Sequence, residues 1–179
     1  MKLIIVRHGQ TEANVDGVLQ GKSADNLTKK GIEQAKSLGK YLKEKYEIDM
    51  VFCSPLKRCV ETLEYVLDEC PIEGPILMSK LIEERDFGEY TGIEHHTINW
   101  DEINQDNKIN KELGIESLTE LKKRTDLFLE DLKLEDNNAT ILVLSHSGPI
   151  RMMINKLTEE DYKEIKIENA LPREFILEI

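Results

Sequence analysis

The stretch KLIIVRHG, residues 2–9, sets an apolar run directly against an arginine, a histidine and a glycine. Short continuous apolar runs are typical of strands that are buried on both faces, as in a parallel sheet covered by helices on each side. Similar runs occur in DMVFC (residues 49–53), ATILVLS (139–145) and REFILEI (173–179). We therefore predict four buried strands, and PILMSKLI (75–82) is a candidate for a fifth.

Helical patterns fill the segments between these runs. Apolar side chains recur on one helical face in residues 27–46 and again in residues 118–132. Ser54 and Pro55 are residue types favoured at the N-cap and the first helical position, so they predict a further helix start. Strands that alternate with helices predict an α/β fold, a three-layer α/β/α sandwich around a mostly parallel sheet, in one domain over residues 1–179.

The bulk properties restrict the partners. The chain has 179 residues and a net charge of -11, which argues against nucleic acids and anionic membranes as ligands. No apolar stretch approaches the roughly 18 residues of a membrane-spanning helix, and Met1 is followed almost directly by a predicted strand. We expect a cytoplasmic protein whose three cysteines, Cys53, Cys59 and Cys70, are reduced and whose partner is a small molecule.

Polar residues follow several of the predicted strands. Arg7 and His8 end the first, Arg58 follows the second, Glu84 follows the fifth candidate, and His146 follows ATILVLS. Because the carboxyl ends of parallel strands meet at one edge of a sheet, these side chains are expected to converge there. Arginine binds phosphate oxygens through a planar fork of donors, so this pocket predicts a phosphoryl group as its ligand.

The same pocket suggests a nucleophile and an acid. A histidine among arginines has a lowered pKa, which leaves one ring nitrogen unprotonated at neutral pH. Its other nitrogen needs a fixed acceptor, for which a backbone carbonyl is the best candidate. A carboxylic acid beside it, Glu84 or its neighbour Glu83, would protonate the leaving oxygen. Gly9 is expected to allow a close approach of the backbone to the substrate phosphate.

Four segments resemble the histidine phosphatase superfamily, also called the phosphoglycerate mutase-like family. RHGQTEAN (residues 7–14) is similar to the segment around its nucleophilic histidine, and SPLKRCVETL (54–63) to its second-arginine segment. IEERDFGEYTG (82–92) resembles its acid-donor segment and VLSHSGPIR (143–151) its second-histidine segment. The segments occur in the order found in the family and span most of the chain.

This resemblance implies a role for each matching residue. His8 would carry the phosphoryl group covalently, Arg7, Arg58 and His146 would bind its oxygens, and Glu84 would protonate the leaving group. Glu84 is preferred to Glu83 because its spacing to Gly88 matches the family pattern. No metal and no cofactor are expected. The implied substrate contacts are Thr11, Asn14, Gln20, Gly21 and Ser147.

The choice of reaction rests on the segment between Glu84 and His146. It is short and carries few basic residues, whereas phosphoglycerate mutases have a longer, more cationic insertion there. We therefore expect a phosphatase acting on a small phosphate monoester. The alternatives are a mutase, a phosphoprotein phosphatase, or an inactive binding module, although none of the expected catalytic residues is missing.

Residues 93–114 are polar and weakly periodic, and they predict a loop with a short helix. Within this segment His95, His96 and Trp100 would either line a lid over the substrate or simply pack against the domain. Adjacent histidines point in different directions on a regular element, which argues against a metal site made by this pair.

Overall fold

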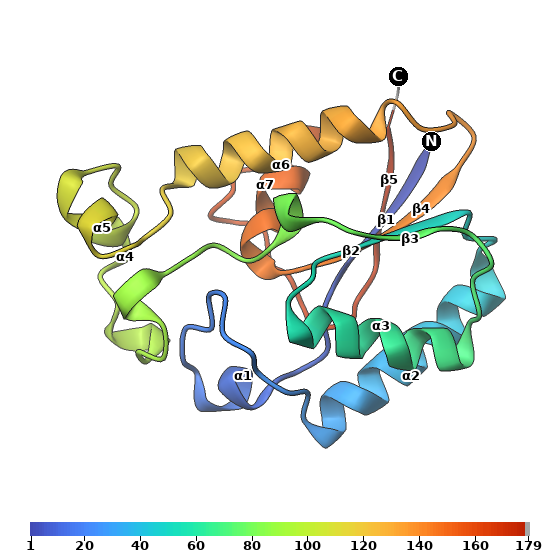
Figure 1. Cartoon of the computed structure of the whole chain (residues 1–179), viewed down its shortest axis with the longest axis horizontal. Helices are drawn as coiled ribbons and strands as arrows, with labels where there is room; N and C mark the ends of the chain where they lie inside the picture. The colour runs from blue at the N-terminus through green and yellow to red at the C-terminus, as the bar shows by residue number, and fades with distance from the viewer. Residues whose placement is uncertain (178–179) are drawn as a thin grey trace.

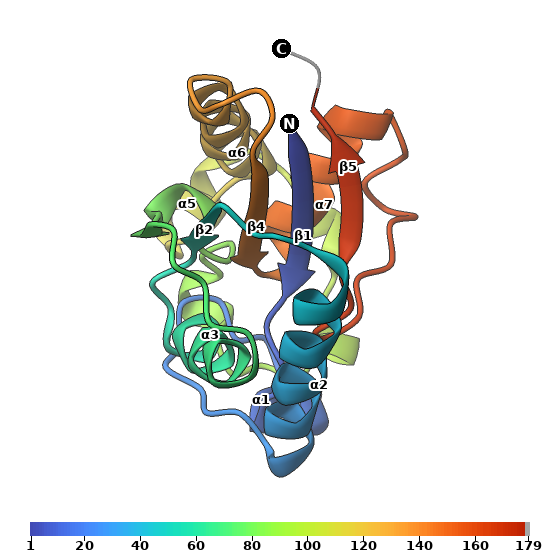
Figure 2. The same ribbon diagram turned by 90° about the vertical axis from the view of Figure 1, so that its right-hand side faces the viewer.

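The computed structural model describes residues 1–177 and contains one sheet of five strands, in the order β3-β2-β4-β1-β5. The strands are β1 (Lys2–Arg7), β2 (Met50–Cys53), β3 (Ile76–Met78), β4 (Thr140–Ser145) and β5 (Arg173–Ile176). The first four run parallel, and β5 pairs antiparallel with β1 (Figure 2). The predicted α/β class and mostly parallel sheet are confirmed.

Helices cover both faces of this sheet (Figure 1). They are α2 (Lys29–Lys45) and α3 (Lys57–Glu69) on one face, and α6 (Leu118–Leu132) and α7 (Ser147–Thr158) on the other. Successive side chains of β1 point to opposite faces. Leu3 and Ile5 pack with residues of α6 and α7, whereas Ile4 and Val6 pack with residues of α2 and α3. The apolar run is therefore continuous because both of its faces are buried, and the three-layer arrangement is confirmed.

The edge strands differ from the prediction. All three residues of β3 are exposed, and β5 alternates between half-buried and exposed positions. An edge strand has a neighbour on one side only, so the covering helices need not extend over it. The candidate strand 75–82 also ends early, because its last part forms a 3₁₀ turn at Lys80–Ile82. Residues 178–179 of the last predicted strand lie outside the described residues.

The starts of α2 and α3 are capped in different ways. Thr28 caps α2 through a hydrogen bond that its hydroxyl accepts from the amide of Gly31. The predicted start at Ser54 is wrong, because α3 begins at Lys57 and Leu56 is its N-cap residue. Ser54 instead contacts His146, a partner from a distant segment, so its tertiary environment overrides its local capping preference.

Short elements surround the carboxyl edge of the parallel strands. They are α1 (Glu12–Asp16), α4 (Trp100–Ile103) and α5 (Lys108–Glu112), seen on the left of Figure 1. A separate apolar cluster, which includes Leu19, Phe87 and Ile103, anchors this part of the chain. The segment 93–114 thus holds two short α-helices and a 3₁₀ turn rather than one. Among residues 1–177, no helix has both the length and the apolar composition needed to cross a bilayer.

Candidate active site

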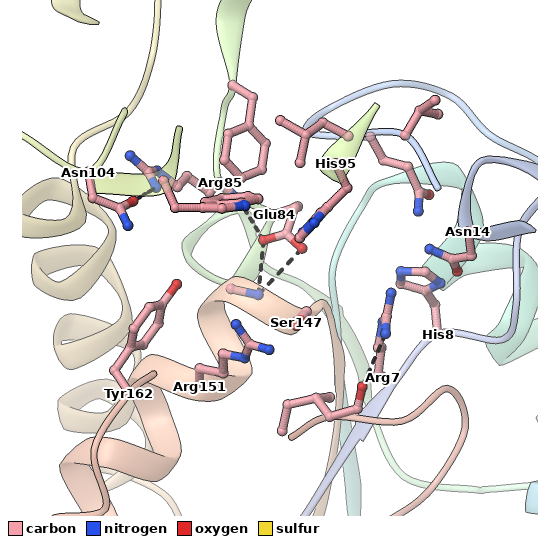
Figure 3. A pocket seen from close by; sticks show the side chains of 18 of the residues that line it. Arg7, His8, Asn14, Glu84, Arg85, His95, Asn104, Ser147, Arg151 and Tyr162 are labelled. Atoms are coloured by element: carbon pink, nitrogen blue, oxygen red, sulfur yellow. Dashed lines mark hydrogen bonds between the residues drawn. The ribbon is translucent and has the colours of Figure 1, made fainter. Parts of the chain in front are cut away.

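A cavity of about 510 Å³ opens at the carboxyl edge of the parallel strands (Figure 3). Arg7 and His8 reach it from the end of β1, Arg58 from the first turn of α3, and Ser147 from the start of α7. Glu84 reaches it from the loop after the 3₁₀ turn that follows β3. Parallel strands and the helices that follow them therefore bring segments far apart in the sequence to one place.

His8 has the geometry of a neutral nucleophile. Its ring is almost fully buried, and Nδ1 lies 2.7 Å from the carbonyl oxygen of Gly9. Because a carbonyl only accepts hydrogen bonds, Nδ1 carries the proton and Nε2 keeps its lone pair. Burial, reinforced by the positive charges of Arg7 and Arg58, places the pKa of His8 well below its ordinary value. The carbonyl acceptor agrees with the sequence analysis, but burial contributes more than the arginines to the lowered pKa.

Gly9 is required where the loop after His8 packs against α2. A Cβ at this position would lie 2.6 Å from the carbonyl oxygen of Gly31, in the first turn of α2. The amide of Gly9 donates to Oγ1 of Thr62, at 2.9 Å. The close backbone approach to α2 and the hydrogen bond to α3 hold the loop after His8 against two helices.

Arg58 is buried and its guanidinium is tightly oriented. Nε donates to Nδ1 of His146 at 3.1 Å, and the two terminal nitrogens donate to the carbonyl oxygens of Ser23, at 3.0 Å, and Gly21, at 2.7 Å. These three bonds leave N–H groups on the same fork for a ligand, since a guanidinium has five donors. Gly21 lines the cavity, and its carbonyl holds this arginine in place.

His146 lies behind the cavity wall rather than on it. Its Nδ1 accepts from Arg58, so the proton is on Nε2, which donates to the hydroxyl of Ser54 at 2.7 Å. Burial, together with the neighbouring positive charges, holds the pKa of His146 well below its ordinary value. A phosphoryl oxygen could reach Nε2 only if this N–H left Ser54. Ser54 was not predicted to contact His146, because its residue type and position are those of a helix cap.

The predicted substrate contacts near α1 form one network. Thr11 is fully buried and does not line the cavity; it caps α1 and donates to the side-chain oxygen of Gln20, at 3.0 Å. The side-chain oxygen of Asn14 accepts from the Thr11 amide and from Asn169, both at 3.2 Å. Gln20 and Asn14 line the cavity, and their amide oxygens are already occupied. Their NH₂ groups are therefore the parts that remain to donate to a ligand.

Glu84 and Glu83 have different environments. Glu84 lines the cavity, and its carboxylate accepts from the amides of Arg85, at 2.8 Å, and Gly148, at 3.1 Å. Glu83 forms a salt bridge with Lys22 at 3.2 Å and does not line the cavity. The structure therefore brings Glu84, and not Glu83, to the predicted site.

Two further arginines hold the segment that carries Glu84. Arg124 forms a largely buried salt bridge with Glu116, at 2.6 Å, and donates to the backbone carbonyl of Glu84 at 3.1 Å. Arg85 donates to the backbone carbonyls of Glu116 and Ile103, each at 2.7 Å. The acid is thus positioned through its backbone as well as its side chain.

The outer wall of the cavity contains residues that the sequence analysis did not assign or left undecided. His95 packs on Trp100 with ring centroids 4.5 Å apart, and both line the cavity. His96 is exposed and lies 3.4 Å from Glu94, so the adjacent histidines point apart. Arg151 and Tyr162 also line the cavity. Arg151 could have been found from its spacing, because it follows Ser147 by one helical turn.

The charge of the cavity favours an anionic ligand. The Nε atoms of Arg7 and Arg151 are buried, and neither has a hydrogen-bond partner in the described part of the chain. Within residues 1–177 neither arginine belongs to a salt bridge, in contrast to Arg124. A buried donor without a partner is costly, so phosphoryl or carboxylate oxygens would supply what the protein does not.

Comparisons with known proteins agree with this chemistry. The family model of the histidine phosphatase superfamily (branch 1) matches residues 3–171. A broad-specificity phosphatase of Saccharomyces cerevisiae is 31% identical over 179 residues, which cover 93% of this chain and 74% of the yeast protein. The matches also include 2,3-bisphosphoglycerate-dependent phosphoglycerate mutases.

Solved structures show the same fold. The alpha-ribazole phosphatase of Shigella flexneri has a TM-score of 0.83 and 26% identity, covering 97% of this chain and 89% of that chain. A phosphoserine phosphatase of Entamoeba histolytica, solved with phosphoserine, has a TM-score of 0.79 and 28% identity, covering 98% and 90%. The chain belongs to the histidine phosphatase superfamily and is a phosphoric monoester hydrolase.

Proposed function

We propose that this protein hydrolyses phosphate monoesters of a small metabolite through a phosphohistidine formed on Nε2 of His8. One observation carries the proposal: a buried, neutral His8, locked by Gly9 in the tautomer that leaves Nε2 free, faces a cavity whose arginines form no salt bridge within residues 1–177. A free imidazole lone pair beside uncompensated guanidinium groups suits attack on phosphorus.

In the first step, Nε2 of His8 forms a bond to phosphorus while the bond from phosphorus to the ester oxygen breaks. The protonated carboxyl of Glu84 gives its proton to that oxygen, so the alcohol leaves neutral. Arg7 and Arg58 offset the charge on the phosphoryl oxygens as the transition state forms. The NH₂ groups of Asn14 and Gln20 and the backbone amide of Ser147 are the further donors that we assign to these oxygens.

In the second step, water attacks the phosphorus of phospho-His8. The carboxylate of Glu84 takes a proton from the water, the bond between nitrogen and phosphorus breaks, and inorganic phosphate is released. His8 and Glu84 return to their starting protonation states. His146 acts in this scheme mainly by orienting Arg58, because its Nδ1 accepts a hydrogen bond from Nε of that arginine. Thr11 acts by orienting Asn14 and Gln20 through hydrogen bonds.

The nucleophile is tested by trapping. Quenching in alkaline denaturant during turnover, followed by mass spectrometry under alkaline conditions, is expected to find a phosphoryl group on the peptide that contains His8, and brief acid treatment should remove it. His8→Ala should abolish both the adduct and turnover, whereas His96→Ala, which removes an exposed histidine, should leave both intact. An adduct that persists in His8→Ala would refute the assignment.

The acid is tested by varying the leaving group. Glu84→Gln should slow glycerol 3-phosphate, whose alkoxide needs a proton, by about a hundredfold or more. It should slow p-nitrophenyl phosphate much less, because nitrophenolate leaves without protonation. Glu83→Gln is the matched control and should affect neither ester. Equal slowing of both esters by Glu84→Gln would assign Glu84 a purely structural role.

The mutase alternative makes a different prediction for the products formed from 3-phosphoglycerate. Incubation with 3-phosphoglycerate should release inorganic phosphate. Conversion to 2-phosphoglycerate without phosphate release, while every other ester stays intact, would replace the phosphatase proposal with the mutase one.

A further inference from the structure

Asn169 lies beside the site, and the reaction proposed above gives it no role. It precedes β5 in the chain and forms an isolated parallel bridge with Arg7 at the end of β1. Its side-chain nitrogen Nδ2 donates to the backbone carbonyl of His8, at 2.9 Å, and to Oδ1 of Asn14, at 3.2 Å. One NH₂ group therefore joins the nucleophile to a residue of the cavity wall.

The segment around Asn169 is fixed against the end of β1. The amide of Ala170 donates to the carbonyl oxygen of Arg7 at 2.9 Å, and Nη1 of Arg7 donates to the carbonyl oxygen of Ile167 at 3.1 Å. Ala170 has a φ of 53°, in the left-handed region that residues other than glycine rarely adopt. Such a conformation costs free energy and persists only where the surrounding contacts impose it. The backbone on either side therefore holds Asn169 next to its two acceptors.

Backbone groups determine which way both side-chain amides face. The carbonyl of His8 can only accept a hydrogen bond, so the atom of Asn169 that faces it is the nitrogen. The amide of Thr11 can only donate, so the atom of Asn14 that lies 3.2 Å from it is the oxygen. Asn169 adds a second donor to the same oxygen. The NH₂ group of Asn14 is therefore turned away from both donors.

The orientation of Asn14 matters because this residue borders the cavity. Figure 3 shows Asn14 beside His8 at the cavity wall. With its oxygen occupied, Asn14 presents N–H donors to phosphoryl oxygens, whereas the opposite orientation would present a lone pair that repels them. The two orientations of a side-chain amide have almost the same shape, so packing selects weakly between them. The hydrogen bonds to Oδ1 make the selection.

We propose that Asn169 is a positioning residue for phosphoryl transfer, which fixes the side-chain amide of Asn14 with its NH₂ group toward the phosphoryl oxygens. The carbonyl of His8 supplies the anchor, because it orients the NH₂ group of Asn169, and this group in turn orients Asn14. Asn169 does not line the cavity, so it acts on the substrate only through Asn14. The inference rests on the proposed phosphatase function, since it concerns the phosphoryl site of that reaction.

The first test compares Asn169→Ala with a matched control. The substitution removes one of the two donors to Asn14 and should lower kcat/KM about tenfold, as expected for a weakened hydrogen bond to a charged group. The loss should be equal for p-nitrophenyl phosphate and glycerol 3-phosphate, because the two esters share the phosphoryl group. Inhibition by inorganic phosphate should weaken by a similar factor. Asn155→Ala also removes a side-chain amide that donates to a backbone carbonyl, that of Glu160, and should leave all these values unchanged.

Asn169→Asp tests the orientation itself. The introduced carboxylate only accepts, so it repels Oδ1 of Asn14 and attracts the NH₂ group, which turns the amide the wrong way. This variant should therefore lose about a further tenfold in kcat/KM relative to Asn169→Ala. It also keeps the size of the side chain, so the inference stays testable if one of the two variants does not fold. Urea unfolding of each variant reports the fold.

Asn14→Ala separates the reversal from the direct effect of the added charge. In this background Asn169→Ala should have little further effect, because no amide remains to be oriented. Asn169→Asp should lose most of its additional effect for the same reason. The remaining loss then measures repulsion between the introduced carboxylate and the phosphoryl group.

The outcomes distinguish this inference from the proposed function. A wild-type protein that hydrolyses neither ester would count against the phosphatase function itself. If the wild-type protein hydrolyses them and Asn169→Ala does so equally well, only the role of Asn169 is overturned. Losses from Asn169→Ala and Asn14→Ala that multiply in the double variant would also overturn it, because Asn169 would then act through the His8 backbone or the stability of the fold.

Discussion

Gly148→Ala tests how the acid Glu84 is positioned. A Cβ at residue 148 would lie 2.4 Å from Oε1 of Glu84, whereas ordinary contacts begin near 3.4 Å. The carboxylate would have to retreat by about 1 Å, and it is the flexible end of a side chain, so the backbone can stay in place. Its hydrogen bond from the Gly148 amide, 3.1 Å long, would weaken or break. The substitution should therefore misplace the acid without disturbing α7.

The expected magnitudes separate activity from stability. A displacement of about 1 Å in a reacting group can cost roughly a hundredfold in rate. Alanine is favoured over glycine inside a helix by about 0.5–1 kcal/mol, which offsets part of the lost hydrogen bond. Gly148→Ala is thus expected to keep the free energy of unfolding within about 1 kcal/mol of the wild type. Its kcat/KM for glycerol 3-phosphate should fall about a hundredfold.

The assay compares two esters and a double variant. Gly148→Ala should slow p-nitrophenyl phosphate only slightly, as Glu84→Gln does, because that leaving group needs no proton. In Gly148→Ala/Glu84→Gln, the second change should add little to the first, since both act on the same proton transfer. Urea unfolding of each variant checks the fold. Multiplicative losses in the double variant, or equal losses on both esters, would refute this reasoning.

Other consequences of the structure are open to direct measurement. Ser54→Ala leaves the buried Nε2–H of His146 without its acceptor, so the free energy of unfolding should fall by about 1–3 kcal/mol in urea titrations, with Ser54→Thr restoring part of it. Arg124→Met leaves a largely buried carboxylate unpaired and should cost about 3 kcal/mol or more, whereas the exposed Lys123→Met should stay within about 0.5 kcal/mol. The pKa values of His8 and His146 lie well below 6.5 in the folded protein, so below this pH the unfolded chain binds more protons. The free energy of unfolding that the neutral histidines contribute should therefore be fully present above pH 6.5. It should fall between pH 6.5 and 5 by up to roughly 1 kcal/mol per pH unit for each histidine. An unfolding midpoint in urea that stays constant over this pH range would contradict the prediction.

The sequence by itself determined the layers of the fold and the place of the site. Continuous apolar runs in β1 and β4 require cover on both faces, and the segments between runs have helical periodicity, so a three-layer fold follows from composition and spacing. Arg7, His8 and Glu84 could be assigned to one edge because parallel strands end on the same side. The edge strands β3 and β5 were less predictable, because an apolar run does not reveal how many neighbours its strand has.

The tertiary structure decided which polar groups act together. Ser54 has the sequence of a helix cap, but its hydroxyl binds a histidine 92 positions away. Adjacent Glu83 and Glu84 are chemically alike, and only their packing sends one to Lys22 and the other to Gly148. Thr11 and His146 lie behind the wall that they were expected to line.

These distinctions share one physical reason. Local preferences for capping, helix and strand depend on a few neighbouring residues, so the sequence expresses them directly. The identity of a hydrogen-bond partner or of an unpaired cation depends on which distant segments pack together. Within residues 1–177 the carboxylate of Glu116 forms a salt bridge with Arg124, whereas no carboxylate does so with Arg151, and this difference arises only when the helices pack on the sheet.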